Sequence, residues 1–156
     1  MNRRKMVSIS WITDQIAVSG AFLSGDIGYI KREAIAAIVD LRSEDCDDAR
    51  LIKDNSIAFL HVDIDDCYAP TFSQLRQIME FVRPLLRNNK KVLLHCQNSC
   101  GRAPLVAVAV LADSGSSIAD AVRLVEDKHP LVGFTPQQEK FVYQDLAKFL
   151  EAEQQY

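Results

Sequence analysis

The chain has 156 residues, of which 48% are apolar and 25% charged, and its formal net charge is −3 at pH 7. This size and composition are typical of one globular domain, so we assign residues 1–156 to a single domain. The slight acidity argues against nucleic acid as a partner, and no stretch approaches the ~20 apolar residues that span a membrane.

The N-terminus does not predict a secreted protein. Residues 1–5 are basic, but polar side chains interrupt residues 7–20, so the apolar core of a signal peptide is missing. We therefore expect a cytoplasmic protein in which the four cysteines, at positions 46, 67, 96 and 100, stay reduced.

The first half of the chain predicts strands around one helix. Residues 8–19 are expected to form two short strands, and residues 35–41 and 57–64 are apolar runs typical of buried strands. From residue 71 to residue 87, apolar side chains recur at helical spacing behind a Thr-x-x-Gln capping box. Pro84 is expected to kink or end this helix near its last turn.

The second half predicts one strand and three helices. Residues 91–94 form a short apolar strand pattern, and residues 105–111 are the apolar run of a buried helix. Residues 117–128 and 136–153 predict two further helices, the second with Thr135 as N-cap and a proline at its first helical position.

The order strand, helix, strand across residues 57–95 is a βαβ unit, which joins parallel strands. The predicted fold class is therefore α/β, with a central, mostly parallel sheet of four to five strands flanked by helices. Loops that follow parallel strands meet at the carboxyl edge of the sheet, where open α/β sheets bind ligands. We expect the loops after Leu41, Ile64 and His95 to lie together at this edge.

The most informative segment runs from His95 to Arg102, between a buried strand and a buried helix, and reads His-Cys-Gln-Asn-Ser-Cys-Gly-Arg. A loop that closes onto a helix N-terminus directs several backbone N–H groups at one point, which suits a phosphate dianion. The same potential predicts a lowered pKa for Cys96 and hence a nucleophilic thiolate. Arg102 would hold two phosphate oxygens in a planar fork. The pattern indicates phosphoryl transfer to sulfur.

Asp66 is the predicted second catalytic group. Asp63 lies within the preceding strand and is expected to be a partly buried structural partner, whereas Asp65 and Asp66 follow where that strand ends. Asp66 is the carboxylate expected to swing over the cradle, protonate the leaving oxygen and later activate water, with Asp65 as its near rival.

With these residues, the chain resembles a cysteine-dependent phosphatase of the compact, single-domain dual-specificity class in the protein tyrosine phosphatase superfamily. The family signature, His-Cys-x-x-Gly-x-x-Arg-Ser/Thr, is matched by His95, Cys96 and Arg102, and its acid loop, Asp-x-x-x-Pro-Ser/Thr, by residues 66–71. The resemblance implies the phosphatase fold, Cys96 as nucleophile, Arg102 as phosphate ligand and Asp66 as general acid. It also implies a cradle of backbone N–H groups from Gln97, Asn98, Ser99, Cys100, Gly101 and Arg102.

Two residues depart from the family pattern. Ser99 stands where the family has a glycine, and if that position needs a positive φ, serine costs on the order of 1–2 kcal/mol of strain. Ala103 stands where the family has a serine or threonine, whose hydroxyl would hydrogen-bond the departing thiolate. We therefore expect the phosphoenzyme to break down roughly 10–100-fold more slowly than it would with that hydroxyl present.

Other uses of these residues stay open. Cys96 could be a small buried side chain, and His95 is assigned only an orienting role through hydrogen bonds to the loop. Cys100 could form a reversible disulfide with Cys96 or have no function. Zinc on these three residues would lack a second pair of ligands, so no metal or other cofactor is predicted. Residues 135–138 resemble a water-positioning element of related phosphatases, but fit a helix cap better.

Phosphatases that act on polyphosphorylated inositides or RNA ends tend to carry basic groups in or beside this loop. The uncharged loop side chains of this chain therefore favour a monophosphate ester, with phosphotyrosine ahead of phosphoserine and phosphothreonine. The predicted function is hydrolysis of such esters, on a phosphorylated protein or a small molecule, with Tyr68 and Arg42 as candidate rim residues. One alternative is a pseudophosphatase that recognises phosphorylated partners, which Ser99 and Ala103 would support. Another is a different thiol enzyme, such as a sulfurtransferase, which would not need Asp66. The sequence does not predict an oligomeric state.

Overall fold

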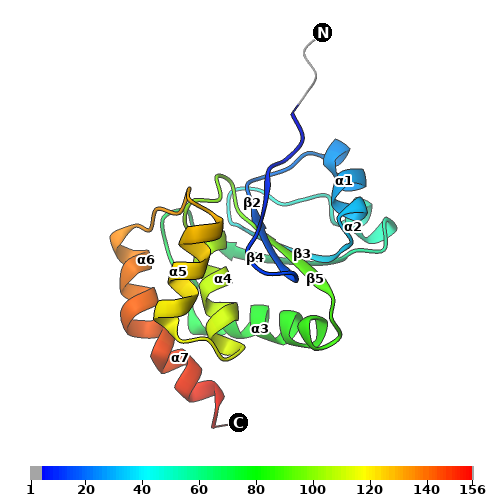
Figure 1. Ribbon diagram of the computed structural model, residues 1–156. Helices are drawn as coiled ribbons and strands as arrows, with labels where there is room; N and C mark the ends of the chain where they lie inside the picture. Colours follow the sequence, from blue (N-terminus) through cyan, green and yellow to red (C-terminus); the bar gives the residue numbers. More distant parts are fainter. Residues whose placement is uncertain (1–4, 156) are drawn as a thin grey trace.

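A five-stranded sheet organises residues 5–155, the part of the chain that the computed structural model describes (Figure 1). The basic residues 1–4 lie outside this part, as does residue 156. The strands are β1 (Ile9–Trp11), β2 (Ile16–Ser19), β3 (Ile35–Arg42), β4 (Ala58–Ile64) and β5 (Lys91–His95).

The strand order in the sheet is β1-β2-β5-β3-β4. Only the short β1 pairs in the antiparallel direction, with β2, while the other described neighbours are parallel. The predicted α/β fold with a mostly parallel sheet is confirmed. Because β3, β4 and β5 run the same way, the loops after Arg42, Ile64 and His95 meet at one edge, as the sequence predicts.

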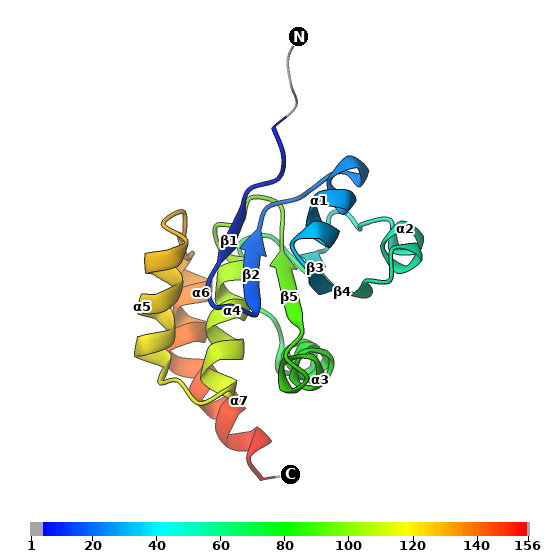
Figure 2. The same ribbon diagram turned by 45° about the vertical axis from the view of Figure 1, so that its right-hand side comes forward.

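Helices cover both faces of the sheet, with α1 and α2 on one side and α4 to α7 on the other (Figure 2). The helices are α1 (Ile27–Arg32), α2 (Ala49–Asp54), α3 (Phe72–Arg87), α4 (Arg102–Asp113), α5 (Ile118–Lys128), α6 (Pro136–Lys140) and α7 (Leu146–Glu153). Apolar side chains of α3, α4, α5 and α7 form one core against the sheet, and those of α1 and α2 form a second, smaller core. Among residues 5–155, no helix combines the length and apolar character needed to cross a bilayer.

Helix α4 is the central helix of the larger core. All its residues from Arg102 to Leu111 are buried, which fits a helix that is apolar on every side except at its first residue. Since only the loop 96–101 separates β5 from α4, this loop is clamped between two largely buried elements of the fold. This clamp positions the predicted phosphate loop.

Two helical details differ from the prediction, and one agrees with it. Helices α1 and α2 are not predicted from sequence, because six residues are too few to display a helical periodicity. Pro84 lies in the last turn of α3, which ends at Arg87, close to this proline as the sequence predicts. The C-terminal helix is interrupted by a π-helical turn, Phe141–Asp145, between α6 and α7.

Candidate active site

The loop from Cys96 to Gly101 joins the end of β5 to the first residue of α4. Its carbonyl oxygens accept hydrogen bonds from neighbouring segments. The donors are the N–H of Ala21 to Gln97 at 3.0 Å, the N–H of Gly133 to Cys100 at 2.8 Å, and Nε2 of His129 to Ser99 at 2.7 Å. With its carbonyl groups held outward, the loop is left with N–H groups facing inward.

The Cys96 sulfur lies at the centre of these N–H groups and is buried. Burial raises the pKa of Cys96 above its ordinary value, against the opposing effect of the N–H groups of Ala103, Ser99 and Asn98 and of the Arg102 charge. The sequence-based prediction of a lowered pKa is therefore wrong. The physical reason is desolvation of the thiol, which outweighs the N–H groups and the charge of Arg102, a residue that is itself paired with a carboxylate.

That carboxylate belongs to Glu44, in the loop after β3. It accepts from both terminal nitrogens of Arg102, Nη1 at 2.6 Å and Nη2 at 2.8 Å, and Nη1 also donates to the carbonyl of Ile64 at 2.8 Å. The hydrogen bonds from Arg102 lower the pKa of Glu44 to about 2, so Glu44 is ionised at neutral pH. Glu44 is a residue of the site that our sequence analysis missed.

The remaining donors of Arg102 are available to a phosphate. Glu44 occupies the end of the guanidinium, whereas Nε is buried and has no hydrogen-bond partner within the described part of the chain. Nε–H and the second Nη2–H form the other fork of the guanidinium, which matches two oxygens of a phosphate. Buried donors are normally paired, so this orphan Nε points to a ligand that the site is built to bind.

Asp66 lies beside that fork, with Oδ1 3.5 Å from Arg102 Nη2. It lines a pocket of about 200 Å³ together with Cys96 and Arg102, as the sequence predicts for the acid loop. Asp65 does not line this pocket. Asp63 was expected to be partly buried, but its side chain is 69% exposed and pairs with His61, because the edge strand β4 leaves that face open.

The acid loop is tied to the start of α6. Thr135 Oγ1 donates to the carbonyl of Cys67 at 2.6 Å, and the buried Gln138 donates from Nε2 to the carbonyl of Tyr68 at 3.2 Å. Thr135 and Gln138 also form a capping box on α6, which confirms the predicted cap. A Cβ on Gly101 would come within 2.5 Å of the Gln138 side chain, so this glycine is needed for space.

Ser99 occupies the strained position of the loop. Its φ is 58°, in the left-handed region that glycine adopts without cost, so the conditional expectation of strain is confirmed. Cys100 is exposed, and its Sγ lies 3.4 Å from the carbonyl of Asn98. Gln97 turns away from the pocket, where its Oε1 accepts from Arg42.

His95 and Arg42 form a buried layer beneath the loop. His95 Nε2 lies 2.5 Å from Asp47 Oδ2, while its Nδ1 makes only a 3.4 Å contact with the carbonyl of Cys96. Its orienting contact is thus mainly with the loop after β3. Arg42, proposed as a rim residue, is instead buried and paired with Asp40 and Asp47, which corrects the prediction.

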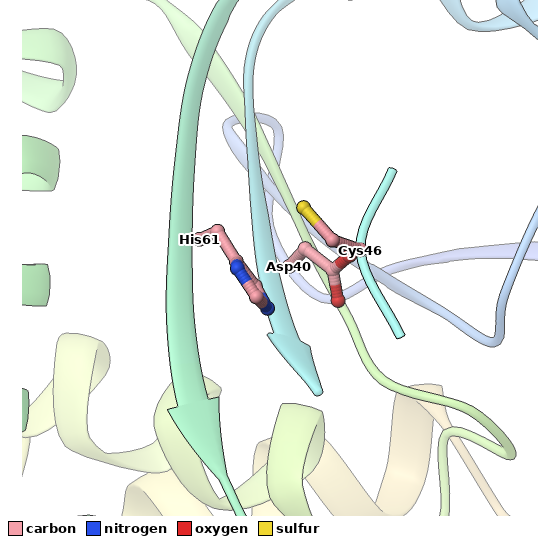
Figure 3. Close-up of side chains that lie close together, drawn as sticks. All are labelled: Asp40, Cys46 and His61. Carbon is pink, nitrogen blue, oxygen red and sulfur yellow. The ribbon is translucent and has the colours of Figure 1, made fainter. Parts of the chain in front are cut away.

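Asp40, Cys46 and His61 lie close enough to suggest a metal site (Figure 3). Asp40, however, has no free lone pair: its oxygens accept from the Arg42 backbone, Arg42 Nε, Arg42 Nη2 and the N–H of Asp47. His61 Nε2 donates to the carbonyl of Arg42 at 2.6 Å. Burial and nearby carboxylates raise the pKa of Cys46, which disfavours a thiolate ligand. These residues hold the loop that carries Glu44 and do not fit a metal ion.

Residues 19–116, more than half of the chain, match a family model described as "Polymorphic toxin system, DSP-PTPase phosphatase". The chain belongs to this family. The match spans the acid loop, the loop after β5 and all of α4, and the predicted membership of the dual-specificity class is confirmed. A comparison with curated proteins finds no match.

Solved structures agree with the family. The crystal structure of Tk-PTP in the active form is 29% identical, with a TM-score of 0.81 over 90% of this chain and 97% of that one. A kinase associated phosphatase whose catalytic-site cysteine is replaced by serine is 20% identical, with a TM-score of 0.81 over 94% and 98%. Human DUSP28 is 20% identical, with a TM-score of 0.75 over 94% and 95%. The last two share the fold. Family and fold together make the chain a phosphatase of this type, which implies phosphorylated substrates.

Proposed function

We propose that this phosphatase hydrolyses phosphate monoesters, phosphotyrosine first and phosphoserine and phosphothreonine also, through a cysteinyl-phosphate intermediate. The observation that carries the proposal is one small pocket lined jointly by a buried cysteine, an arginine with an orphan buried Nε, and a carboxylate 3.5 Å from that arginine. The residues are Cys96, Arg102 and Asp66. Nucleophile, phosphate ligand and acid are the three groups that such a transfer needs.

In the first step, Cys96 Sγ attacks phosphorus and the bond from phosphorus to the ester oxygen breaks. Asp66 in its acid form gives its proton to that leaving oxygen. The equatorial oxygens are held by the side-on fork of Arg102 and by the N–H groups of the loop, which stabilise the charge that builds up in the transition state.

The raised pKa of Cys96 does not prevent this step. A thiol beside a phosphate dianion holds as many protons as a thiolate beside a phosphate monoanion. The proton of Sγ can therefore pass to a phosphate oxygen when the substrate binds, and the nucleophile is ionised within the complex. Activity then requires either the dianionic substrate with the protonated thiol or the monoanionic substrate with the thiolate.

In the second step, Asp66 as carboxylate takes a proton from water, the water oxygen attacks phosphorus, and the bond from sulfur to phosphorus breaks. The departing thiolate is stabilised by the N–H groups of Ala103, Ser99 and Asn98. No side-chain hydroxyl follows Arg102 to assist it, since position 103 is alanine.

The test is hydrolysis of para-nitrophenyl phosphate by matched variants. Cys96→Ser should abolish turnover, and Asp66→Asn should lower kcat by about 10²–10⁴-fold, while Asp65→Asn serves as a control with the same charge change one residue away. Rapid acid quench followed by mass spectrometry should find one phosphoryl group on Cys96. Activity that survives Cys96→Ser, or equal losses in the two aspartate variants, would refute the assignment.

A pseudophosphatase is the second candidate, and three observations favour it. Ser99 is strained, Ala103 offers no hydroxyl, and the pKa of Cys96 is raised. In that case the wild type should bind a phosphotyrosine peptide with neither phosphate release nor a phosphoenzyme. For either function we propose a cytoplasmic protein, and localisation of a tagged chain by fractionation tests this.

A further inference from the structure

The phosphate loop and the segments that border it carry negatively charged side chains and no lysine or arginine. These are segments 20–23, 43–48, 65–71, 96–101 and 129–135. They hold six carboxylates, which are Glu44, Asp45, Asp47, Asp48, Asp65 and Asp66. Two arginines lie directly beside these segments in the chain, Arg42 and Arg102; both are buried, and each is already paired with a carboxylate.

An acidic rim alone would identify no ligand. Here, however, it surrounds a group that requires an anion: Arg102 lines the pocket, is 2% exposed and leaves Nε without a partner in the described part of the chain. The pocket is therefore suited to one phosphate at its base, while the carboxylates of the bordering segments repel further negative charge. Such an arrangement suits a substrate with a single phosphate and positive charge close to it.

A second cavity borders the same loop and has the matching chemistry. It has a volume of about 260 Å³, and its walls combine the apolar side chains of Phe22, Leu23 and Leu51 with the exposed carboxylates of Asp45 and Asp48. Apolar walls with acidic groups at the rim fit the aliphatic stem and cationic head of an arginine or lysine side chain. The charge of Arg42 within this cavity is offset by Asp40 and Asp47. Asp45 also lies 3.5 Å from Arg42 Nη1, but its side chain is 66% exposed.

The two cavities are one residue apart in the loop. Gln97 lines the second cavity and Asn98 lines the catalytic pocket. The two cavities therefore border the same loop, and a side chain next to the phosphorylated residue is the part of a peptide that would face the second cavity. We infer that the substrate is a phosphopeptide segment with arginine or lysine beside the phosphorylated residue, the basic side chain lying in the cavity lined by Asp45 and Asp48. This rests on the function proposed above.

The test compares phosphotyrosine peptides that differ only in flanking arginines or glutamates. At low salt, kcat/KM should favour the basic peptide by on the order of 10-fold, from two exposed ion pairs worth about 0.5–1 kcal/mol each. The ratio should shrink in 0.5 M salt, where the Debye length is about 4 Å. The ratio is taken within each variant, so a general change in activity cancels.

Asp45→Asn combined with Asp48→Asn should reduce the ratio several-fold. The matched control, Asp14→Asn combined with Asp120→Asn, removes the same charge from the β1–β2 turn and the first turn of α5, outside the lining of both cavities, and should leave the ratio unchanged. A ratio of one or less in the wild type, or equal ratios in the two double variants, would overturn the inference. Better turnover of a soluble inositol phosphate than of the basic peptide would also overturn it.

Failure of this inference is distinguishable from failure of the proposed function. Hydrolysis of para-nitrophenyl phosphate without a preference for the basic peptide rejects only the inference. If the wild type hydrolyses neither para-nitrophenyl phosphate nor the peptides, the preference is measured by binding instead. Fluorescence anisotropy with the Cys96→Ser variant then gives the ratio of the Kd values of the acidic and basic peptides. A binding ratio near one then rejects the inference, and a ratio near 10 supports it without turnover.

Discussion

Ser99→Gly should stabilise the protein even though glycine usually destabilises. Ser99 has a φ of 58°, where an L-residue loses about 1–2 kcal/mol to the contact between its Cβ and the backbone. Glycine removes this strain, but it also adds about 0.4–1 kcal/mol of conformational entropy to the unfolded chain. The net gain is on the order of 0.5–1 kcal/mol, which corresponds to a rise in Tm of about 1–4 °C for a domain of this size.

Glycine substitutions at two other serines distinguish the release of backbone strain from the entropy gained by the unfolded chain. Ser56 has a φ of 62° in the exposed turn after α2, so Ser56→Gly should also stabilise, away from the site. Ser116 is exposed and is not among the described residues with positive φ, so Ser116→Gly should destabilise by about 0.4–1 kcal/mol. Urea unfolding of all three variants at pH 7 gives the free energies, and differential scanning calorimetry gives the Tm values.

The reasoning fails if Ser99→Gly lowers stability as Ser116→Gly does while Ser56→Gly raises it. That pattern would mean that the serine side chain at position 99 makes contacts worth more than the strain. Because the N–H and carbonyl of residue 99 are the same in serine and glycine, we expect kcat/KM to change by less than about threefold. A larger loss would mean that the hydroxyl itself acts in the reaction.

Three more predictions concern the same loop and its partners. Ala103→Ser should speed the breakdown of the phosphoenzyme by roughly 10–100-fold and so remove a burst of para-nitrophenol in rapid-quench kinetics; a wild type without a burst, or a variant with unchanged turnover, contradicts this. Gly101→Ala should cost about 1–3 kcal/mol and lower kcat, because the new Cβ displaces Gln138 from its bonds to the acid loop, whereas Gly133→Ala, with open space around it, should cost less than about 1 kcal/mol. Glu44→Gln should lower Tm at pH 7 by about 2–4 °C, since the ion pair is partly exposed. Because the pKa of Glu44 falls from 4.5 to about 2, the stabilisation is complete above pH 4.5 and is lost as the pH drops towards 2, so the difference in Tm should shrink there.

The parts of the site that sequence predicts are those with local signals. The strand–loop–helix context of Cys96 and Arg102 is contiguous in the chain, and the edge on which Asp66 lies follows from parallel strands. The capping boxes that begin with Thr71 and Thr135 are four-residue patterns, and both form as predicted. In each case the causes lie within a few residues of the effect.

The missed features depend on contacts between distant segments. Glu44 reaches Arg102 across 58 positions, and nothing in its own neighbourhood distinguishes it from the other acids of the loop. The pKa of Cys96 depends on how completely the fold buries its sulfur, which no sequence window reports. The π-helical turn at 141–145 consists of residues that an α-helix also accepts, so the helical pattern runs through it without a break.

The raised pKa of Cys96 and the acidic rim both affect which substrate the site can bind and activate. A free phosphate dianion approaching this site meets the carboxylates of the rim before it reaches the fork of Arg102. In the proposed mechanism, the same dianion on a basic peptide would bring cations that offset this repulsion, and it would then receive the proton of Sγ inside the pocket. Binding of the correct substrate would therefore also generate the nucleophile, so selectivity for basic sequences would appear in kcat as well as in KM. Preference confined to KM would instead mean that the basic side chain contributes only to uniform binding.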